Sequence, residues 1–170
     1  MKLSHPCPFR VLFTFFAIFN IVTLFSNNAW AIAGVDFPLE EDLEFSEVQQ
    51  MIDDGKYDEA VSYLNSEVLE WYPENAEALT LKGYSLRGLN QNNESMDAYN
   101  AALASNPEHK GALEYQGELY LKLGNQKNAQ SNLEKLESIC PNGCDAFYTL
   151  QTAIEKFKDG SITWTPPEKS

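Results

Sequence analysis

The sequence is poor in the side chains that most enzymes recruit for catalysis. Its 170 residues include two histidines and three cysteines, and one of each falls within the first ten positions. His109 is then the one histidine left for a Ser-His-Asp or Cys-His arrangement. The sequence also has no glycine-rich phosphate loop and no histidine-rich helix. These gaps predict a protein that is not an enzyme and that uses no cofactor or metal.

Basic residues are scarce as well. Twelve Lys and Arg stand against 25 Asp and Glu, which gives a formal net charge of −13 at pH 7. Nucleic-acid phosphates and anionic membranes both attract basic surfaces, so this balance argues against either kind of partner. The acidic excess is compatible with a basic partner, although a solvated acidic surface is the simpler explanation.

The longest apolar run, residues 11–25, lies close to the N-terminus. Two basic residues precede it, small-residue sites follow it, and it is shorter than the roughly 20 residues of a membrane-spanning helix. This order predicts a cleavable signal peptide over residues 1–31, with cleavage after Ala31 or Ala33. The alternative is an uncleaved anchor. With cleavage, we expect an exported chain without stable membrane insertion.

The remainder of the chain repeats itself with a period of about 34 residues. Gly83 aligns with Gly117, and the prolines Pro73, Pro107 and Pro141 recur at the same spacing. Apolar residues recur at helical spacing between these marks, and nothing alternates with a period of two. The pattern therefore predicts pairs of helices without a sheet, because proline cannot continue the second helix of each pair.

Small residues in this pattern allow close approach and sharp turns. Gly83 and Gly117 lie on the first helix of a pair, where a small residue lets the second helix come close, and Ala60 and Ala129 do the same from the second helix. Gly55 and Gly124 lie where a helix ends and the backbone needs a left-handed residue. The first unit is offset from the second by 35 residues at these marks, so it has one extra residue.

The pattern resembles the tetratricopeptide repeat, a helix-turn-helix unit of about 34 residues. The resemblance covers residues 42–144. In the middle unit, Ser95 replaces the expected alanine and Asn90 the expected glycine. Three stretches carry the match: "GKYDEAVSYL", "LKGYSLRGLNQNNESMDAYNAAL" and "YQGELYLKLGNQKNAQSNLEKL".

The resemblance implies an all-α fold, an α-solenoid of three tetratricopeptide-like hairpins. Residues 145–158 carry an apolar stripe and predict a C-terminal capping helix, which covers the last hydrophobic face of the array. We thus expect seven helices. The remaining boundaries are a linker at 32–41, repeats at about 42–75, 76–109 and 110–143, and a flexible tail at 159–170.

Cys140 and Cys144 flank a Pro-Asn-Gly turn before the capping helix. A chain reversal can bring two Cα atoms within the roughly 4.4–6.8 Å that a disulfide needs, and export favours oxidised cysteines. A redox-active pair stays open, because a helix N-terminus stabilises a thiolate. A metal site would need further ligands. His109 lies about thirty residues away, where we expect a solvated loop residue.

The resemblance also implies a concave groove, made mainly by the first helix of each unit, that binds a protein or peptide. Phe45 and Tyr84 could anchor a ligand side chain or helix, although Phe45 could instead only pack within the array, as could Ile52. Glu114 and Glu118 could meet a basic residue. The groove positions carried over are Phe45, Gln49, Ile52, Thr80, Tyr84, Arg87, Glu114, Glu118 and Leu121.

These observations predict a non-catalytic scaffold or assembly helper that binds proteins or peptides in the bacterial cell envelope. The periplasm is the expected location, since such repeats are common in exported bacterial proteins. Relatives that clamp the acidic C-terminus of a chaperone carry Lys and Asn in the groove, and this sequence does not, so that ligand is not expected. The alternative function is a periplasmic thiol–disulfide component acting through Cys140 and Cys144.

Overall fold

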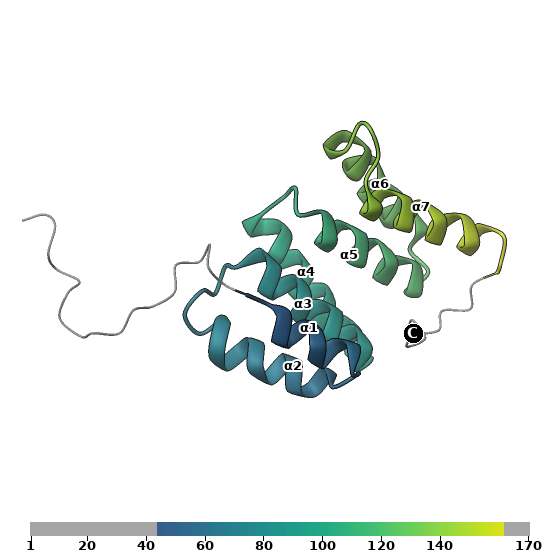
Figure 1. Ribbon diagram of the computed structural model, residues 1–170. Coiled ribbons are helices and arrows are strands. Elements are labelled where there is room, and N and C mark those ends of the chain that lie inside the picture. The colour runs from purple at the N-terminus through teal and green to yellow at the C-terminus, as the bar shows by residue number, and fades with distance from the viewer. Residues whose placement is uncertain (1–43, 162–170) are drawn as a thin grey trace, which may run out of the picture. The chain divides into compact units, whose positions relative to one another are not determined.

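The computed structural model describes residues 44–161, and every regular element in that range is a helix (Figure 1). The predicted all-α fold of three hairpins and a capping helix is confirmed. The predicted signal peptide, the linker and most of the tail lie outside the described residues. The helices are α1 (Ser46–Asp53), α2 (Tyr57–Tyr63), α3 (Ala76–Gly88), α4 (Asn92–Ser105), α5 (Lys110–Lys122), α6 (Gln126–Ile139) and α7 (Asp145–Lys158), and a π-helical turn, η2 (Leu64–Val68), continues α2.

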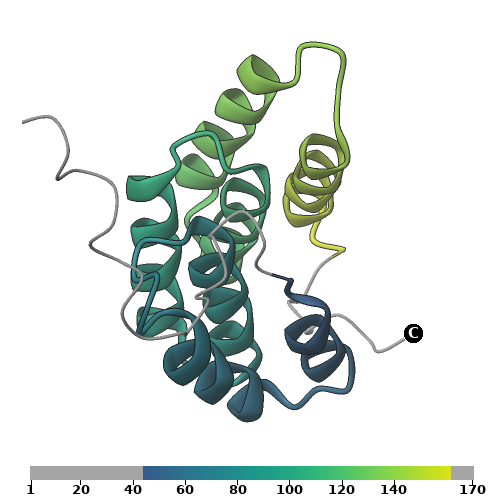
Figure 2. The same ribbon diagram turned by 60° about the vertical axis from the view of Figure 1, so that its left-hand side comes forward.

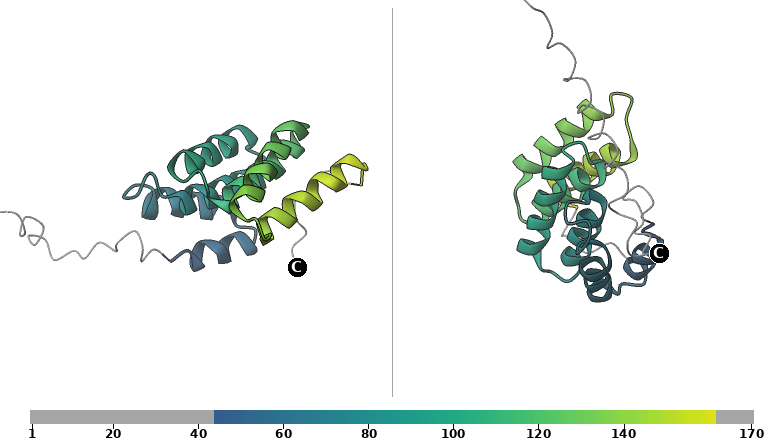
Figure 3. Two further views of the ribbon diagram at one scale, coloured as in Figure 1. Left: turned by 90° about the horizontal axis from the view of Figure 1, so that it is seen from above. Right: turned by 90° about the vertical axis from the view of Figure 1, so that its left-hand side faces the viewer.

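The helices pack as successive antiparallel pairs. Helix α1 packs on α2, α3 on α4, and α5 on α6, while α7 packs on both helices of the last pair. Neighbouring pairs are joined by contacts of α3 with α2 and of α5 with both α3 and α4. Figure 2 and Figure 3 show the pairs following one another, with α7 after the last of them. Each hairpin therefore buries an apolar face of the next.

The hydrophobic core lies between the helix pairs and divides into clusters. One cluster joins the first hairpin to α3, and a second joins α5, α6 and α7. The capping helix thus supplies apolar side chains to the end of the array, as its stripe predicts. Core members of the first cluster include Val48, Ile52, Leu64, Val68 and Leu81, and those of the second include Leu113, Leu121, Leu136, Leu150 and Ile154.

The extra residue of the first unit is absorbed by the π-helical turn. Ala60 and Pro73 are one residue farther apart than their equivalents in the two later units. Between them, the N–H of Leu69 donates to the carbonyl of Leu64 at 2.8 Å, a bond that spans five residues instead of four. A π-turn inserts one residue into a helix without ending it. The insertion therefore leaves the pairing of α2 with its neighbours intact.

The turn after each first helix uses a left-handed residue, including the one that is not glycine. The backbone φ is 71° at Gly55, 60° at Asn90 and 75° at Gly124. Asparagine tolerates this region better than other residues with a side chain. Asn90 therefore takes the conformation of the glycine that it replaces, and the second repeat keeps the turn of the other two.

Polar side chains tie the helices of the second and third hairpins together. Ser95 of α4 is buried and its hydroxyl donates to the carbonyl of Gly83 in α3 at 2.7 Å. Asn132 of α6 donates from Nδ2 to the carbonyl of Leu113 in α5 at 3.1 Å. Ser95, which departs from the expected alanine, is therefore accommodated because its hydroxyl finds an acceptor across the hairpin.

Two glycines allow close helix contacts, with different partners. A methyl group at Gly83 would lie 2.5 Å from Cε1 of Tyr99, so α3 approaches α4 within the same hairpin, as predicted. At Gly117 a methyl group would lie 2.6 Å from Cδ2 of Leu150, on the capping helix. Gly117 therefore allows close contact of α5 with α7, whereas the sequence predicts close contact of α5 with α6, the second helix of its own pair.

We predict that Gly83→Ala lowers the free energy of unfolding by about 1–3 kcal/mol, because the new methyl group overlaps the buried Tyr99 ring. Urea denaturation followed by circular dichroism measures the change. Gly111→Ala is the matched control in α5, since its methyl group would meet nothing closer than 3.6 Å. The control should be neutral or stabilising by up to about 1 kcal/mol, the usual gain in helix propensity. Equal stability of both variants contradicts the packing argument.

Candidate functional site

A mixed aromatic and charged cluster lies where the second repeat meets the third. Its members are Tyr84 and Arg87 of α3 and Glu114, Tyr115 and Glu118 of α5, which we call the Arg87 cluster. Four of these five residues are among the predicted groove positions. The structure therefore brings four of the six predicted positions of the second and third repeats together across the repeat boundary.

Arg87 is the centre of the cluster. Its side chain is 5% exposed, and Nη1 donates to Oε2 of Glu118 at 2.7 Å and to the carbonyl of Tyr115 at 3.2 Å. The guanidinium carbon lies 4.9 Å from the ring centre of Tyr84 and 5.6 Å from that of Tyr115. A planar guanidinium donates hydrogen bonds in its own plane while its faces lie against aromatic rings, a geometry that the compact ammonium group of lysine does not offer. Arg87 thus links α3 to α5 and holds two tyrosines in place.

Tyr84 and Tyr115 form an edge-to-face pair, with ring centres 5.0 Å apart and an interplanar angle of 62°. Both rings are half-buried. Tyr115 is the member that sequence reasoning missed, because the family's groove positions on this helix are Glu114, Glu118 and Leu121. An aromatic residue one turn before Glu118 was the available signal.

Glu114 differs from Glu118 in its electrostatic surroundings. Within residues 44–161, no Lys, Arg or His side chain forms an ion pair with it. Loss of hydration on burial, together with the nearby carboxylates of Glu118 and Asp145, raises the pKa of Glu114 to about 7, while Arg87 opposes the rise. Near neutral pH this carboxylate is therefore about half ionised.

Four of the other five predicted groove residues are buried or pack within the array. Ile52 and Leu121 are buried in the core, and Phe45 packs against the first-hairpin cluster. Thr80 is 1% exposed and donates to the carbonyl of Ala76 within its own helix at 2.6 Å.

Gln49 is exposed and donates to Asp53 one turn further along α1. The surface that the predicted positions offer is therefore concentrated at the Arg87 cluster. Their role in binding stays a prediction.

His109 is a structural residue and not the solvated loop residue that the sequence suggested. It caps the N-terminus of α5, where Nδ1 accepts the N–H of Ala112 at 3.1 Å. Its Nε2 lies 2.9 Å from Oε2 of Glu77 on α3. The sequence signal was its place immediately before a helix, but histidine is an uncommon N-cap residue.

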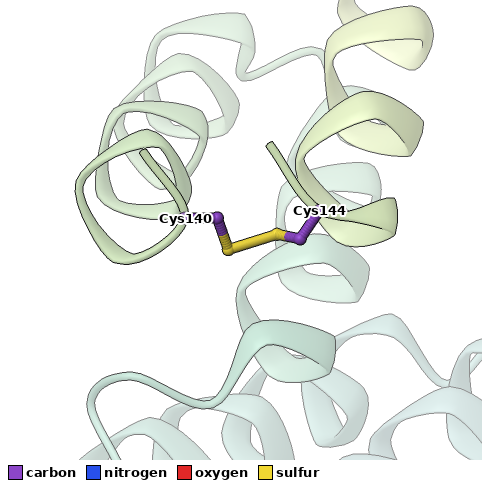
Figure 4. Close-up of a disulfide and its surroundings, with 2 residues drawn as sticks. All are labelled: Cys140 and Cys144. Atoms are coloured by element: carbon purple, nitrogen blue, oxygen red, sulfur yellow. A yellow bond between two sulfur atoms is a disulfide. The ribbon is translucent and has the colours of Figure 1, made fainter. Parts of the chain in front are cut away.

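Cys140 and Cys144 are joined in a disulfide (Figure 4). Their Cα atoms are 5.9 Å apart, Cys140 follows α6, and Cys144 is the N-cap residue of α7. The intervening turn contains Gly143 with a φ of 83°, a conformation suited to glycine. The bond therefore fixes the end of the third hairpin to the start of the capping helix.

Within residues 44–161, every helix is too short or too polar to span a membrane. No group of three or more His, Cys, Asp or Glu side chains in that range is arranged to hold a metal ion.

Comparisons with known proteins agree with this architecture. Residues 80–130 match the family described as tetratricopeptide repeat. Among solved structures, a tetratricopeptide repeat protein from Parabacteroides merdae ATCC 43184 aligns with a TM-score of 0.57 and 24% identity, over 66% of this chain and 43% of that one. No curated protein matches the sequence. The alignment covers less than half of the length of the Parabacteroides merdae protein.

Residues 80–130 thus match the tetratricopeptide repeat family, and the fold of the described residues is shared with a solved protein of that family. Repeats of this family generally mediate protein–protein interaction or scaffolding, and proteins that contain them are typically non-catalytic.

We predict that replacing both Cys140 and Cys144 by serine lowers the free energy of unfolding by about 2 kcal/mol, the loop-entropy value for so short a loop. Thermal denaturation of the oxidised wild type and of the variant measures the difference. Reduction of the wild type with dithiothreitol should reproduce the loss, whereas the variant should not respond to it. An unchanged melting temperature contradicts a stabilising role for this disulfide.

We predict that Glu114→Gln stabilises the protein at pH 8 and not at pH 4. Because folding raises the pKa of Glu114 from 4.5 to about 7, the folded chain binds the proton more tightly. Its contribution to stability is complete below about pH 4.5 and is lost as the pH rises through 7. Since Glu114 is partly exposed, we expect a gain of about 1 kcal/mol for the variant at pH 8.

Urea denaturation at both pH values measures this effect. Glu134→Gln, at an exposed position on α6, is the control and should change neither value. A Glu114→Gln variant that is less stable than wild type at pH 8 contradicts the assignment.

Proposed function

We propose that this protein is a non-catalytic scaffold or assembly helper that binds a protein or peptide through the first helices of its repeats. The Arg87 cluster is the observation that carries the proposal. It places two half-buried tyrosines and two carboxylates at a repeat boundary, on helices α3 and α5. Tyrosine and arginine are enriched among the residues that contribute most to protein interfaces.

The cluster is preorganised, which supports a role in binding. Arg87 is buried and its contacts to Glu118 and Tyr115 hold α5 and the aromatic rings in a fixed arrangement. A ligand that meets such a surface pays little entropy to order it. Thr80, Ile52 and Leu121 are buried, so we assign them to the packing of the array and not to direct contact with the ligand.

The proposed ligand is basic. The cluster contains two carboxylates and one guanidinium, and the whole chain carries 25 acidic against 12 basic residues. A basic segment would be drawn to this surface by charge complementarity, which increases association rates and discriminates against acidic partners.

The proposed location is the bacterial cell envelope. The basic start, the apolar run and the small-residue sites of residues 1–33 support export. The Cys140–Cys144 disulfide is in keeping with an oxidising compartment. The two cysteines lie between α6 and α7 and none of their described contacts favours thiol–disulfide exchange, so the role that we propose for the disulfide is structural.

We predict that Tyr84→Ala reduces capture of the partner at least tenfold when the tagged protein is used as bait in extracts of cells that produce it. Loss of an aromatic interface residue commonly costs 1.4 kcal/mol or more, about tenfold in affinity. Tyr148→Ala is the matched control, since Tyr148 is an exposed tyrosine on α7 outside the cluster. A photo-crosslinking residue at position 84 should label the same protein, and one at position 148 should not. The same captured proteins at the same yield with Tyr84→Ala as with wild type contradict the proposal.

A further inference from the structure

We propose that His109 is a pH-sensitive switch at the boundary between the second and third repeats, which caps α5 when it is neutral and turns toward α3 when it is protonated. Its imidazole lies between the two helices. Oγ1 of Thr80 on α3 is 3.4 Å from Nδ1, and a methyl group at Gly111 of α5 would lie 3.6 Å from Cε1. This inference goes beyond the proposed binding function and does not depend on it.

The position of His109 is a helix cap in the preceding repeat as well. Asn75 lies one repeat length earlier, and its Oδ1 accepts the N–H of Ala78 at 2.8 Å at the start of α3. Nδ1 of His109 accepts the N–H of Ala112 at 3.1 Å in the same way. An amide oxygen accepts at any ordinary pH, whereas an imidazole nitrogen accepts only while it is unprotonated. The third repeat therefore has a cap that depends on pH where the second has one that does not.

The two hydrogen bonds of the ring fix the tautomer of the neutral form. Because Nδ1 accepts a backbone N–H, the proton of neutral imidazole lies on Nε2. Nε2–H then donates to Oε2 of Glu77, which is 2.9 Å away on α3. Neutral His109 therefore caps α5 and contacts α3 at the same time.

Protonation removes one of these contacts and strengthens the other. A proton on Nδ1 makes that nitrogen a donor, so it faces the N–H of Ala112 without accepting it. A cation at the N-terminus of a helix is also disfavoured by the backbone dipoles. Oγ1 of Thr80 offers an alternative acceptor, since its own hydrogen is donated to the carbonyl of Ala76 at 2.6 Å. The protonated ring is therefore drawn from α5 toward α3.

The charged groups around the ring decide which effect is larger. The Glu77 side chain contacts the ring but is 47% exposed, so its ion pair with a protonated imidazole contributes little. Glu108 and Lys110 flank His109 in the chain, are both exposed and carry opposite charges. The end of α4 presents an uncharged group, the carbonyl of Asn106, which accepts the N–H of His109 at 3.1 Å. Loss of the cap is therefore the larger effect, and acid loosens the first turn of α5.

The switch acts on the two helices that carry the Arg87 cluster. Glu77 lies in the first turn of α3 and Arg87 in its last turn, so two contacts join α3 to the third repeat at opposite ends of α3. The guanidinium of arginine keeps its charge at any physiological pH. Acid therefore alters the contact at His109 and leaves that of Arg87 with Glu118, which confines the change to the start of α5.

NMR spectroscopy of the full chain at pH 8 and pH 5 tests this inference. At pH 8 the imidazole nitrogen resonances of His109 should show a protonated Nε2 and an unprotonated Nδ1. At pH 5 the protection factor of the Ala112 amide, which corrects for the intrinsic effect of pH on exchange, should be about fivefold lower. This change corresponds to about 1 kcal/mol, a typical value for an N-cap. The Ala78 amide, capped by Asn75, is the internal control and should keep its protection.

His109→Asn is the matched variant, because it gives the third repeat the cap of the second. Its Ala112 amide should keep the same protection at both pH values. A proton on Nδ1 at pH 8, unchanged protection of Ala112 in the wild type, an equal loss at Ala78, or the same loss in His109→Asn overturns the inference. The comparison of Ala112 with Ala78 in the wild type decides the question even where the variant does not fold.

Discussion

The arrangement of this surface depends on one buried cation. Arg87 is 5% exposed, and a buried charge without a partner costs several kcal/mol. Glu118 of the next repeat supplies the partner, while Tyr84 and Tyr115 cover the guanidinium. The same interaction therefore joins two repeats and orders the aromatic rings. Glu118 is committed to Arg87, and the neighbouring Glu114 is half-buried and forms no ion pair with any side chain of residues 44–161.

The repeats tolerate departures from their pattern because each departure has a local physical remedy. Asn90 adopts the left-handed backbone of the glycine that it replaces. Ser95 satisfies its buried hydroxyl on the Gly83 carbonyl. The extra residue of the first unit is taken up by η2, whose π-turn lengthens the helix path by one residue. The stacking of the hairpins is thereby preserved, and α3 and α5 are held side by side at the Arg87 cluster.

Periodicity in the sequence was sufficient to predict the architecture, but not the partners of individual side chains. The 34-residue spacing and the apolar stripe of residues 145–158 predicted three hairpins and α7 (Asp145–Lys158). Spacing does not say which neighbour a small residue meets, and Gly117 contacts the capping helix through Leu150. Nor does it reveal that a histidine caps a helix or that Tyr115 turns toward Tyr84, because these depend on how consecutive repeats are rotated against one another.

The central claim is that Arg87 and Glu118 act as one pair across the repeat boundary. A double-mutant cycle with Arg87→Met, Glu118→Gln and the combined variant, measured by urea denaturation, tests it most directly. Each single variant leaves one group of a buried pair behind, so the account predicts that the double variant loses at least about 1 kcal/mol less than the two single losses together. Losses that add to within about 0.3 kcal/mol would contradict the account, since independent side chains add in that way.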